Sequence, residues 1–252
     1  MAEDISQILK NWPFNDQDLN VRFIEGNDGR QKIQMRLDLG LLQMEIDGRP
    51  DGKRPRNSES YLDYFENRAQ QTLKNPERSP FKLSASDCFK LQQEAVQYYH
   101  RYLALMKLQD FNRVLRDTQR NLKVFDFVEK YSDNDEVVWQ FQQHRPYVIM
   151  MNVRAQALAL LQGEQFETAL EIISEGIHLI EQFNEKWSEH TAPDHPELEF
   201  LQYWHTEIAS QKPMTEKERL NLELQEAVDK ENYERAAELR DKLASLEKAL
   251  KL

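Results

Sequence analysis

The feature that most constrains the fold of this chain is an internal repeat of helical pattern. Residues 103–128 can be laid over residues 158–183, so that Phe111 meets Phe166 and Leu115 meets Leu170. With the same offset, matching apolar positions continue at Leu122 and Ile177, Phe125 and Ile180, and Val128 and Phe183. In each copy a turn separates two stretches with helical spacing of apolar residues. The repeat therefore predicts two stacked helical hairpins.

The second copy resembles a tetratricopeptide repeat (TPR). Gly163 stands at the tight turn and Phe166 is the turn aromatic. Ala169 is the small packing residue, and Gly176 stands where a small residue allows close helix approach. The tryptophan and the closing proline of that family's pattern are missing. A generic antiparallel pair of helices remains the alternative.

Helical patterns extend over most of the chain. Hydrophobic residues make up 40% and charged residues 31% of the sequence, with only 7 Gly and 9 Pro, a balance typical of a helix-rich globular protein. Ser86 is the predicted N-cap of a helix that leads to Asp110, and Pro146 is expected to interrupt a long helix. The segments predicted to be helical are 58–73, 86–110, 112–131, 136–162 and 197–211.

Residues 21–47 have a β pattern instead. Two β-rich runs are joined by Asn27-Asp28-Gly29, a sequence that favours the positive φ of a hairpin turn. Ile33, Met35 and Leu37 alternate with polar residues, which indicates a strand with one wet face, and a third run follows Gly40. Three short antiparallel strands are expected.

The segment 47–56, which we call the basic loop, follows the predicted strands. Its two Gly and two Pro prevent continuous helix or strand, and its basic side chains outnumber its acids, so an exposed cationic loop is predicted. It is a candidate surface site because binding residues are often carried on loops, although a solvated turn that closes the meander is the alternative. The candidate contacts are Arg49, Asp51, Lys53 and Arg54.

Residues 220–248 resemble the UVR motif, which occurs at the end of UvrB, within UvrC, and in adaptors and regulators of bacterial protease complexes. The resemblance rests on Leu224, Ala227, Val228, Tyr233, Glu234, Ala236, Ala237, Leu239, Arg240, Asp241 and Leu246. It implies a helical hairpin that pairs with a second hairpin, in another copy of this chain or in another UVR-bearing protein. The residues expected to contact such a partner are Leu224, Ala227, Val228, Tyr233, Ala236, Ala237, Arg240 and Asp241.

The apolar spacing of the same segment supports this interpretation without the resemblance. Two apolar helical faces are expected on either side of a polar bend at Asp229 to Asn232. The first is lined by Leu220, Leu224, Ala227 and Val228, and the second by Ala236, Ala237, Leu239, Leu243 and Leu246. A hairpin of this size buries little core by itself, so its apolar face is expected to seek another surface. Residues 29–55 also look like the start of an uncharacterised family of bacterial proteins that end in a UVR motif.

Charge and motif content restrict the functional class. A formal net charge of −11 disfavours a general nucleic-acid binder, and no segment approaches the length of a membrane span. The first residues lack the pattern of a secretory signal, and the lone Cys88 fits a reducing compartment, so a cytoplasmic location without membrane contact is expected. No catalytic motif and no cofactor-binding fingerprint is found. His190, Asp194 and His195 are the only metal-like cluster, and their spacing matches no well-known ligand pair, so no metal site is predicted.

These observations predict a mainly α protein with a small N-terminal antiparallel β-meander, an α+β arrangement with stacked TPR-like hairpins and a C-terminal UVR hairpin. The predicted division is 1–57 for the meander and basic loop, 58–211 for the helical domain and 212–252 for the hairpin. The expected function is a non-enzymatic adaptor that binds a partner protein or self-associates. The alternative is an accessory factor of bacterial nucleotide excision repair that contacts DNA or UvrB/UvrC-type proteins.

Overall fold

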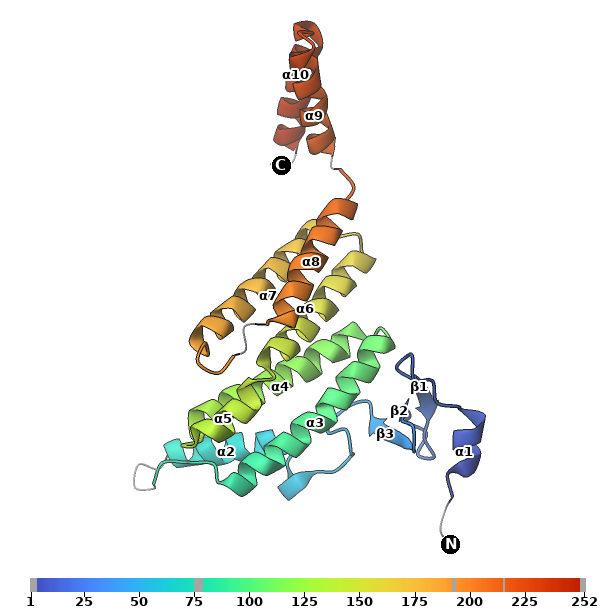
Figure 1. Cartoon of the computed structure of the whole chain (residues 1–252), viewed down its shortest axis with the longest axis vertical. Helices are drawn as coiled ribbons and strands as arrows, with labels where there is room; N and C mark the ends of the chain where they lie inside the picture. Colours follow the sequence, from blue (N-terminus) through green and yellow to red (C-terminus); the bar gives the residue numbers. More distant parts are fainter. Residues whose placement is uncertain (1–3, 75–78, 192–193, 215, 250–252) are drawn as a thin grey trace. The chain divides into compact units, whose positions relative to one another are not determined.

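The computed structural model describes residues 4–74, 79–191, 194–214 and 216–249, with side chains left out at 216–218 and 247–249. The chain divides into two compact units, Met1–His205 and Thr206–Leu252. The first holds a small sheet and most of the helices, and the second is a helical hairpin (Figure 1). The mainly α fold with an N-terminal meander is therefore confirmed. Among the described residues, each helix is either too short or too polar to cross a bilayer.

The β-meander forms where its sequence pattern predicts it. Strands β1 (Val21–Glu25), β2 (Gln31–Arg36) and β3 (Leu41–Glu45) pair antiparallel in the order β1-β2-β3. Gly29 has a φ of +71° in the first turn, as the Asn-Asp-Gly sequence requires. Ile33 and Met35 are buried as expected, but the predicted wet face is wrong, because Gln34 and Arg36 between them are buried as well. The Arg36 side chain donates to the carbonyl oxygens of Trp12 at 3.0 Å and Gly40 at 2.9 Å, which compensates its burial. A short helix, α1 (Ser6–Asn11), precedes the sheet.

The helices of the first unit follow the predicted segments closely. A 3₁₀ turn, η1 (Pro55–Asn57), closes the basic loop. The helices are α2 (Tyr61–Leu73), α3 (Ala85–Lys107), α4 (Phe111–Tyr131), α5 (Asp135–Gln142), α6 (Arg145–Gln162), α7 (Phe166–Lys186) and α8 (Pro196–Gln211). Pro146 stands at the start of α6, where its missing N–H costs nothing, so the expected interruption is a true helix boundary.

One predicted cap is wrong. Helix α3 is capped by Ser84 rather than Ser86, because Asp87 stands three residues after Ser84 and completes a capping box. The Asp87 N–H donates to the Ser84 hydroxyl oxygen at 3.2 Å, and the Ser84 N–H donates back to the Asp87 carboxylate at 3.3 Å.

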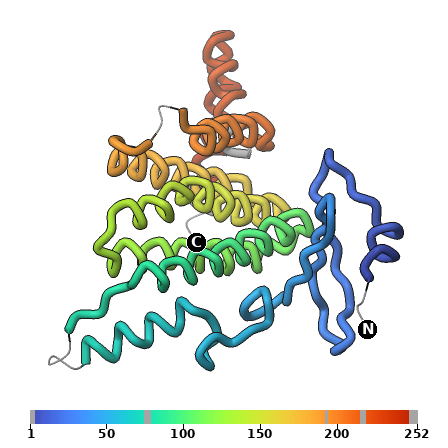
Figure 2. The backbone as a smooth tube through the Cα atoms, turned by 60° about the horizontal axis from the view of Figure 1, so that its bottom comes forward, coloured from blue at the N-terminus to red at the C-terminus, as the bar shows by residue number. Residues whose placement is uncertain are grey.

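The predicted stack of helical hairpins is confirmed. Helix α4 packs against α3 and also against α6, and α6 packs against α7, so the α3/α4 and α6/α7 hairpins lie side by side (Figure 2). Gly176 allows α7 to approach α6 closely, since a Cβ atom there would lie 2.5 Å from a methyl group of Val153. This is the role that the sequence predicts for Gly176. A buried cluster from α2, α3, α4, α5 and α6 forms the core, with Phe65, Leu91, Val124 and Phe141 among its members.

Three helix–helix turns of the chain share one conformation. In each, a residue in the left-handed region is followed first by the residue that precedes the next helix and then by an aromatic residue that begins it. The left-handed residues are Gln109 (φ +59°), Glu164 (φ +57°) and Glu231 (φ +56°). The aromatic residues are Phe111, Phe166 and Tyr233.

The backbone hydrogen bonds of these turns are also the same. The N–H of the residue before the aromatic donates to a carbonyl five residues back in the preceding helix, which satisfies a carbonyl that the helix end would otherwise leave unpaired. The three bonds are Asp110 to Leu105 at 3.0 Å, Gln165 to Leu160 at 3.0 Å and Asn232 to Ala227 at 2.8 Å. The repeat detected between residues 103 and 183 therefore has a third example of its turn in the C-terminal hairpin.

Candidate functional site

The C-terminal hairpin is the strongest candidate site. It consists of α9 (Glu216–Asp229) and α10 (Tyr233–Ala249), and its inner face is apolar. Leu239 is only 1% exposed, and burying a leucine side chain contributes about 1.5–3 kcal/mol. The remaining buried residues are Leu220, Ala227, Ala236 and Leu243, with Leu224 and Leu246 partly buried against them. The two alanines are small enough to let the helices approach closely.

The turn of the hairpin is held by its own polar groups. Asn232 caps α10, because its side-chain oxygen accepts the Arg235 N–H at 3.2 Å. Across the hairpin, the Arg235 guanidinium lies 3.3 Å from a carboxylate oxygen of Glu223. Both side chains are more than 40% exposed, so this ion pair contributes at most about 1 kcal/mol. Packing of the inner face is therefore the main stabilising contribution.

The outer surface of the hairpin carries the chemistry that a partner would meet. Tyr233 is 68% exposed and Val228 is 43% exposed, and these two residues flank the turn. Helical spacing puts Ala237 and Arg240 on the same stripe of α10 as Tyr233. Arg240 and its neighbour Asp241 lie 3.2 Å apart but are 72% and 73% exposed, so both charges remain available to a partner.

The eight residues predicted from the UVR resemblance thus separate into two groups. Ala227 and Ala236 are buried inside the hairpin and Leu224 is partly buried there, so these three hold the two helices together. The other five are exposed, namely Val228, Tyr233, Ala237, Arg240 and Asp241. We call these five the outer stripe. The predicted apolar faces are therefore wrong for Val228 and Ala237, which are exposed, because periodicity alone does not separate the residues of the inner face from small and apolar residues beside it.

Comparison with protein families matches residues 215–249 to the UvrB/uvrC motif (UVR). The match covers α9 and α10, and the predicted UVR hairpin is confirmed. The motif is a binding module associated with protein and DNA interaction in excision repair. Comparison with curated proteins and with solved structures returns no match.

The basic loop is less exposed than its sequence predicts. The prediction is wrong for Arg49, whose side chain is only 9% exposed. Its Nε atom lies 3.0 Å from a carboxylate oxygen of the fully buried Glu94, and its guanidinium carbon lies 5.2 Å from the centre of the Tyr61 ring. Glu94 also accepts the Tyr61 backbone N–H at 2.8 Å, so this arginine fastens the loop to the start of α2.

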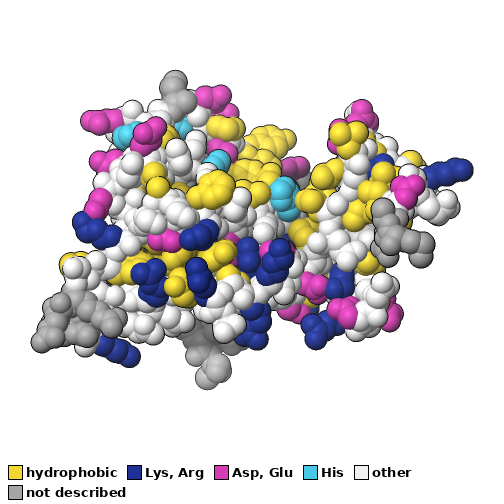
Figure 3. Space-filling model, turned by 90° about the horizontal axis from the view of Figure 1, so that it is seen from below, with side chains coloured by type: hydrophobic (Ala, Val, Ile, Leu, Met, Phe, Trp, Pro, Cys, Tyr) yellow, Lys and Arg dark blue, Asp and Glu magenta, His cyan; other side chains and the backbone are white. Residues whose placement is uncertain are grey.

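The other loop residues are exposed but partly occupied. The Asp51 carboxylate accepts the Lys53 N–H at 3.0 Å, and Arg54 is ion-paired with Glu59. On the face of the molecule drawn in Figure 3, Lys and Arg side chains lie among hydrophobic side chains, with Asp and Glu side chains beside them. A role of Asp51, Lys53 and Arg54 in binding remains a prediction.

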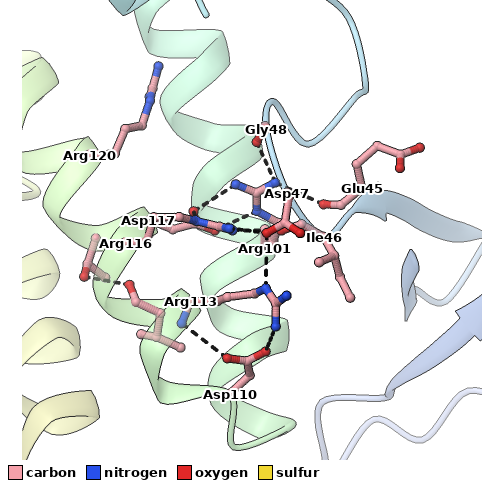
Figure 4. A network of polar contacts seen from close by, with 12 residues as sticks. Glu45, Ile46, Asp47, Gly48, Arg101, Asp110, Arg113, Arg116, Asp117 and Arg120 are labelled. Atoms are coloured by element: carbon pink, nitrogen blue, oxygen red, sulfur yellow. Dashed lines mark hydrogen bonds and ion pairs between the residues drawn. The ribbon is translucent and has the colours of Figure 1, made fainter. Parts of the chain in front are cut away.

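A buried polar network behind the basic loop was missed by the sequence analysis (Figure 4). Arg101 and Asp117 are fully buried and form a bidentate pair, with N–O distances of 2.6 and 2.8 Å. The remaining nitrogen of Arg101 donates to the carbonyl oxygens of Glu45 at 3.0 Å and Gly48 at 2.8 Å. The pair therefore joins α3 and α4 to the end of the meander.

A second, more exposed part of the network lies beside it. Arg116 lies 2.6 Å and Arg113 3.2 Å from Asp47 in the loop. Burial opposes ionisation of Asp47, but the two guanidinium groups outweigh it and lower the pKa of that carboxyl group. Asp110, and after it Asp47, raises the pKa of Arg113. These ion pairs hold Asp47, and with it the start of the basic loop, against α4.

A signal for the buried pair was present in the sequence. Glu94 and Arg101 stand at positions of α3 where helical spacing from Leu91, Tyr98 and Leu105 predicts the buried face. A charged residue on a buried face is rare unless it is paired. Its appearance there predicts an ionic partner nearby, although the identity of that partner depends on tertiary packing.

The histidine cluster near the end of α7 does not form a metal site among the described residues. His190 packs instead on two tryptophan rings, with ring centres 5.0 Å from Trp139 and 5.6 Å from Trp187. His195 and Asp194 line a small cavity of about 150 Å³ beside it.

Proposed function

We propose that this protein is a non-enzymatic adaptor whose C-terminal hairpin docks onto a partner protein through the outer stripe. The observation that supports it is the exposure of Tyr233. The corresponding aromatic residue of the first hairpin, Phe111, is only 7% exposed, whereas Tyr233 is 68% exposed at the same position of the same turn. Large aromatic side chains of this kind are the residues that most often dominate binding energy at protein interfaces.

The composition of the outer stripe suits such an interface. Val228 and Tyr233 supply an apolar centre, and Ala237 leaves room for a neighbouring helix. Arg240 and Asp241 are opposite charges next to the apolar centre, which would restrict the choice and orientation of the partner. A second UVR hairpin, in another copy of this chain or in a different protein, would offer a helical surface of matching size.

The sequence resemblances agree with this proposal. The bacterial proteins that the meander segment resembles also end in a UVR motif, and the TPR-like pattern of residues 158–183 is common in proteins that assemble others. We place the adaptor in the bacterial cytoplasm, which fits the acidic composition and the single Cys88.

The test is affinity capture with the full chain from a bacterial lysate, with mass spectrometry of the captured proteins. Tyr233→Ala and Arg240→Ala should each remove the same proteins from the capture. The matched control is Tyr203→Ala, which removes an aromatic side chain that is 71% exposed on α8. The proposal is wrong if Tyr233→Ala and Tyr203→Ala give the same captured proteins as the wild type and sedimentation velocity shows a monomer for all three.

The second candidate function is an accessory factor of nucleotide excision repair, favoured by the association of the UVR motif with that pathway. This function could be performed by recruiting repair proteins or by contacting DNA directly, and each can be tested separately. Capture of UvrB- or UvrC-type proteins that depends on Tyr233 would place the adaptor in repair. Direct DNA contact through Lys53, Arg54 and Arg56 requires binding to a DNA duplex that weakens with salt and with neutralisation of these residues. Absence of DNA binding at low salt would exclude that case.

A further inference from the structure

The first unit contains an apolar groove that is separate from the hairpin. Helices α3 and α6 both pack on α4, and two cavities lie between them. The first cavity has a volume of about 430 Å³ and the second about 710 Å³. Tyr147 of α6 lines both cavities, so they share this side chain as a wall, and we call the two together the groove.

Aromatic side chains form the first part of this groove. The ring of Tyr99 lies with its centre 6.1 Å from that of Tyr147 and 5.5 Å from that of Tyr102. Phe125 of α4 and Phe141 of α5 line the same cavity. On its rim, Val96 is 47% exposed, and Phe89, one heptad earlier on α3, is 58% exposed. Exposed apolar side chains beside an apolar cavity are typical of a protein-binding surface.

The charge of the groove is the feature that specifies its occupant. The chain contains 44 Asp and Glu residues against 33 Lys and Arg, yet among the residues that the structure describes none that lines either cavity is acidic. The charged residues that line it are Lys107 and Arg154. Lys107 is ion-paired with Asp18 at 2.7 Å.

Arg154 is different from Lys107, because among the described residues it has no carboxylate partner. Its guanidinium group is half-buried, 3.8 Å from the Met151 sulfur and 5.0 Å from the centre of the Phe200 ring. A guanidinium group held against apolar side chains gains most from a carboxylate, since charge-assisted bidentate bonds are stronger in such surroundings. The groove thus offers apolar contacts around one unsatisfied positive charge.

We propose that this groove binds an amphipathic helix of a partner protein, with an apolar stripe in the groove and an Asp or Glu side chain on Arg154. The residues of α6 that line the groove run from Tyr147 to Gln162, about four helical turns. Tyr147 and Met151 precede Arg154, and Leu158 and Leu161 follow it. The occupant therefore continues past Arg154 in both directions, and its carboxylate belongs to a side chain rather than to a chain end.

This inference rests on the proposed adaptor function and assigns it a second binding site, with a defined partner chemistry. The two sites would let one chain hold two proteins together. Because the groove lies wholly within Met1–His205, its occupancy can be measured without reference to the hairpin.

The experiment is a display selection on the full chain with random 16-residue peptides whose C-terminus is fused to the carrier. Enriched peptides should contain one Asp or Glu flanked by aromatic or leucine residues at helical spacing. A labelled copy of the best peptide is then titrated by fluorescence anisotropy, together with a copy in which the acid is replaced by its amide. The amide peptide should bind about tenfold more weakly, the loss expected for one charge-assisted pair.

Variants of the protein locate the binding site. Arg154→Met keeps the apolar contacts of the side chain and should weaken the acidic peptide about tenfold while leaving the amide peptide unchanged. Val96→Asp on the exposed rim should weaken both peptides. Leu39→Ser, which changes a side chain that is 88% exposed in the meander, is the matched control and should weaken neither. Circular dichroism of each variant checks that the fold is retained.

Several outcomes would overturn the proposal. They are failure to enrich any peptide, equal binding of the acidic peptide to Arg154→Met and wild type, and enrichment only from a library with free C-termini. Concentration-dependent dimerisation that Val96→Asp abolishes would identify a second copy of this chain as the occupant instead. If Tyr233→Ala does not change the captured proteins but the groove still binds its peptide, docking through the hairpin is rejected and binding in the groove is retained. The failures of the two proposals are therefore distinguishable.

Discussion

The first and the last helical hairpins have the same turn and opposite surroundings. In the α3/α4 hairpin, Phe111 at the turn is covered by packing, and the buried Arg101–Asp117 pair joins the hairpin to the meander. In the α9/α10 hairpin, Tyr233 is exposed at the same position, and the ion pairs of the described residues are all on the surface. The same turn conformation therefore occurs in the packed α3/α4 hairpin and in the exposed α9/α10 hairpin. The surroundings of each hairpin determine whether the aromatic residue at its turn is buried.

Each helical hairpin has an inner face, which packs its two helices together, and an outer face, which contacts its surroundings. The inner face closes the pair of helices in every copy, through Val114, Ala169 or Ala236 three residues after the aromatic residue. The outer face is apolar enough to be covered by neighbouring helices in the middle of the chain. In the α9/α10 hairpin, Tyr233 on this face is exposed, and a partner can bind there.

The largest expected effect comes from truncating the aromatic residue of each hairpin. Phe111→Ala should lower the free energy of unfolding by about 3–5 kcal/mol, because it leaves a cavity in a packed region. Tyr233→Ala should lower it by less than about 0.5 kcal/mol, because the side chain is exposed. All four Trp residues lie in Met1–His205, so tryptophan fluorescence during urea unfolding measures the loss of stability caused by Phe111→Ala. Circular dichroism follows the unfolding of both variants. Equal losses for the two variants would refute the comparison.

The buried ion pair gives the next largest effect. Asp117→Asn should lower the free energy of unfolding by about 3 kcal/mol, since it leaves the buried Arg101 without a counter-charge. Glu59→Gln, which breaks an exposed pair with Arg54, is the control and should change stability by less than about 1 kcal/mol. Chemical unfolding curves of both variants give the two values. A loss for Asp117→Asn no larger than that of the control would mean that the pair is not needed to hold the meander.

The close approach of α6 and α7 predicts a smaller loss. Gly176→Ala should lower the free energy of unfolding by about 1–2 kcal/mol, because the new methyl group clashes with the stiff Val153 side chain and the gain in helix propensity offsets only part of the strain. The corresponding position of the last hairpin is Leu243, which is 9% exposed, so the same register tolerates a large residue there. Val153→Ala combined with Gly176→Ala should recover part of the loss. Additive losses in the double variant would argue against the clash.

The smallest expected effect is a difference in pH response between the two units. Burial lowers the pKa of His100 and of His144, so the folded chain binds these protons less readily than the unfolded chain. The stability that they contribute is present above the unfolded pKa of about 6.5 and is lost as the pH falls below it. The urea concentration at the midpoint of unfolding, followed by tryptophan fluorescence, should therefore decrease as the pH is lowered from about 7.5 to about 5.5. His100→Gln should make this decrease smaller. Residues 206–252 contain no His, so the hairpin should not share this response.

Most of the fold could be predicted from the sequence, because its elements are specified by local patterns. The three strands follow β-rich runs and a Gly-containing turn, and the helices follow apolar spacing with recognisable starts and stops. The alternation in β2 predicted the existence of the strand but not its burial, since Gln34 and Arg36 are buried too. The N-cap of α3 was predicted at Ser86 instead of Ser84, because the capping box of Ser84 with Asp87 was not recognised. The third copy of the hairpin turn was also missed, since Tyr233 resembles Phe111 and Phe166 only in its place after a left-handed residue.

The candidate site could be predicted only in part, for a physical reason. Spacing identifies Ala236 and Tyr233 as parts of one motif, but only the packed hairpin shows that the first is buried and the second exposed. In the basic loop, the composition suggested free positive charge. Arg49 is instead neutralised by Glu94, a residue 45 positions later in the sequence, and partners at that separation are set by tertiary structure.

The contact of Arg101 with the carbonyl oxygens of Glu45 and Gly48 has a consequence for biosynthesis. The sheet emerges from the ribosome before α3 and α4, yet the charged group that holds its last strand is completed only when Asp117 has been made. An Arg101 without that carboxylate would bring an uncompensated charge into an apolar interior. The sheet should therefore reach its final place only after both α3 and α4 have left the exit tunnel, and the order of synthesis is not the order of folding.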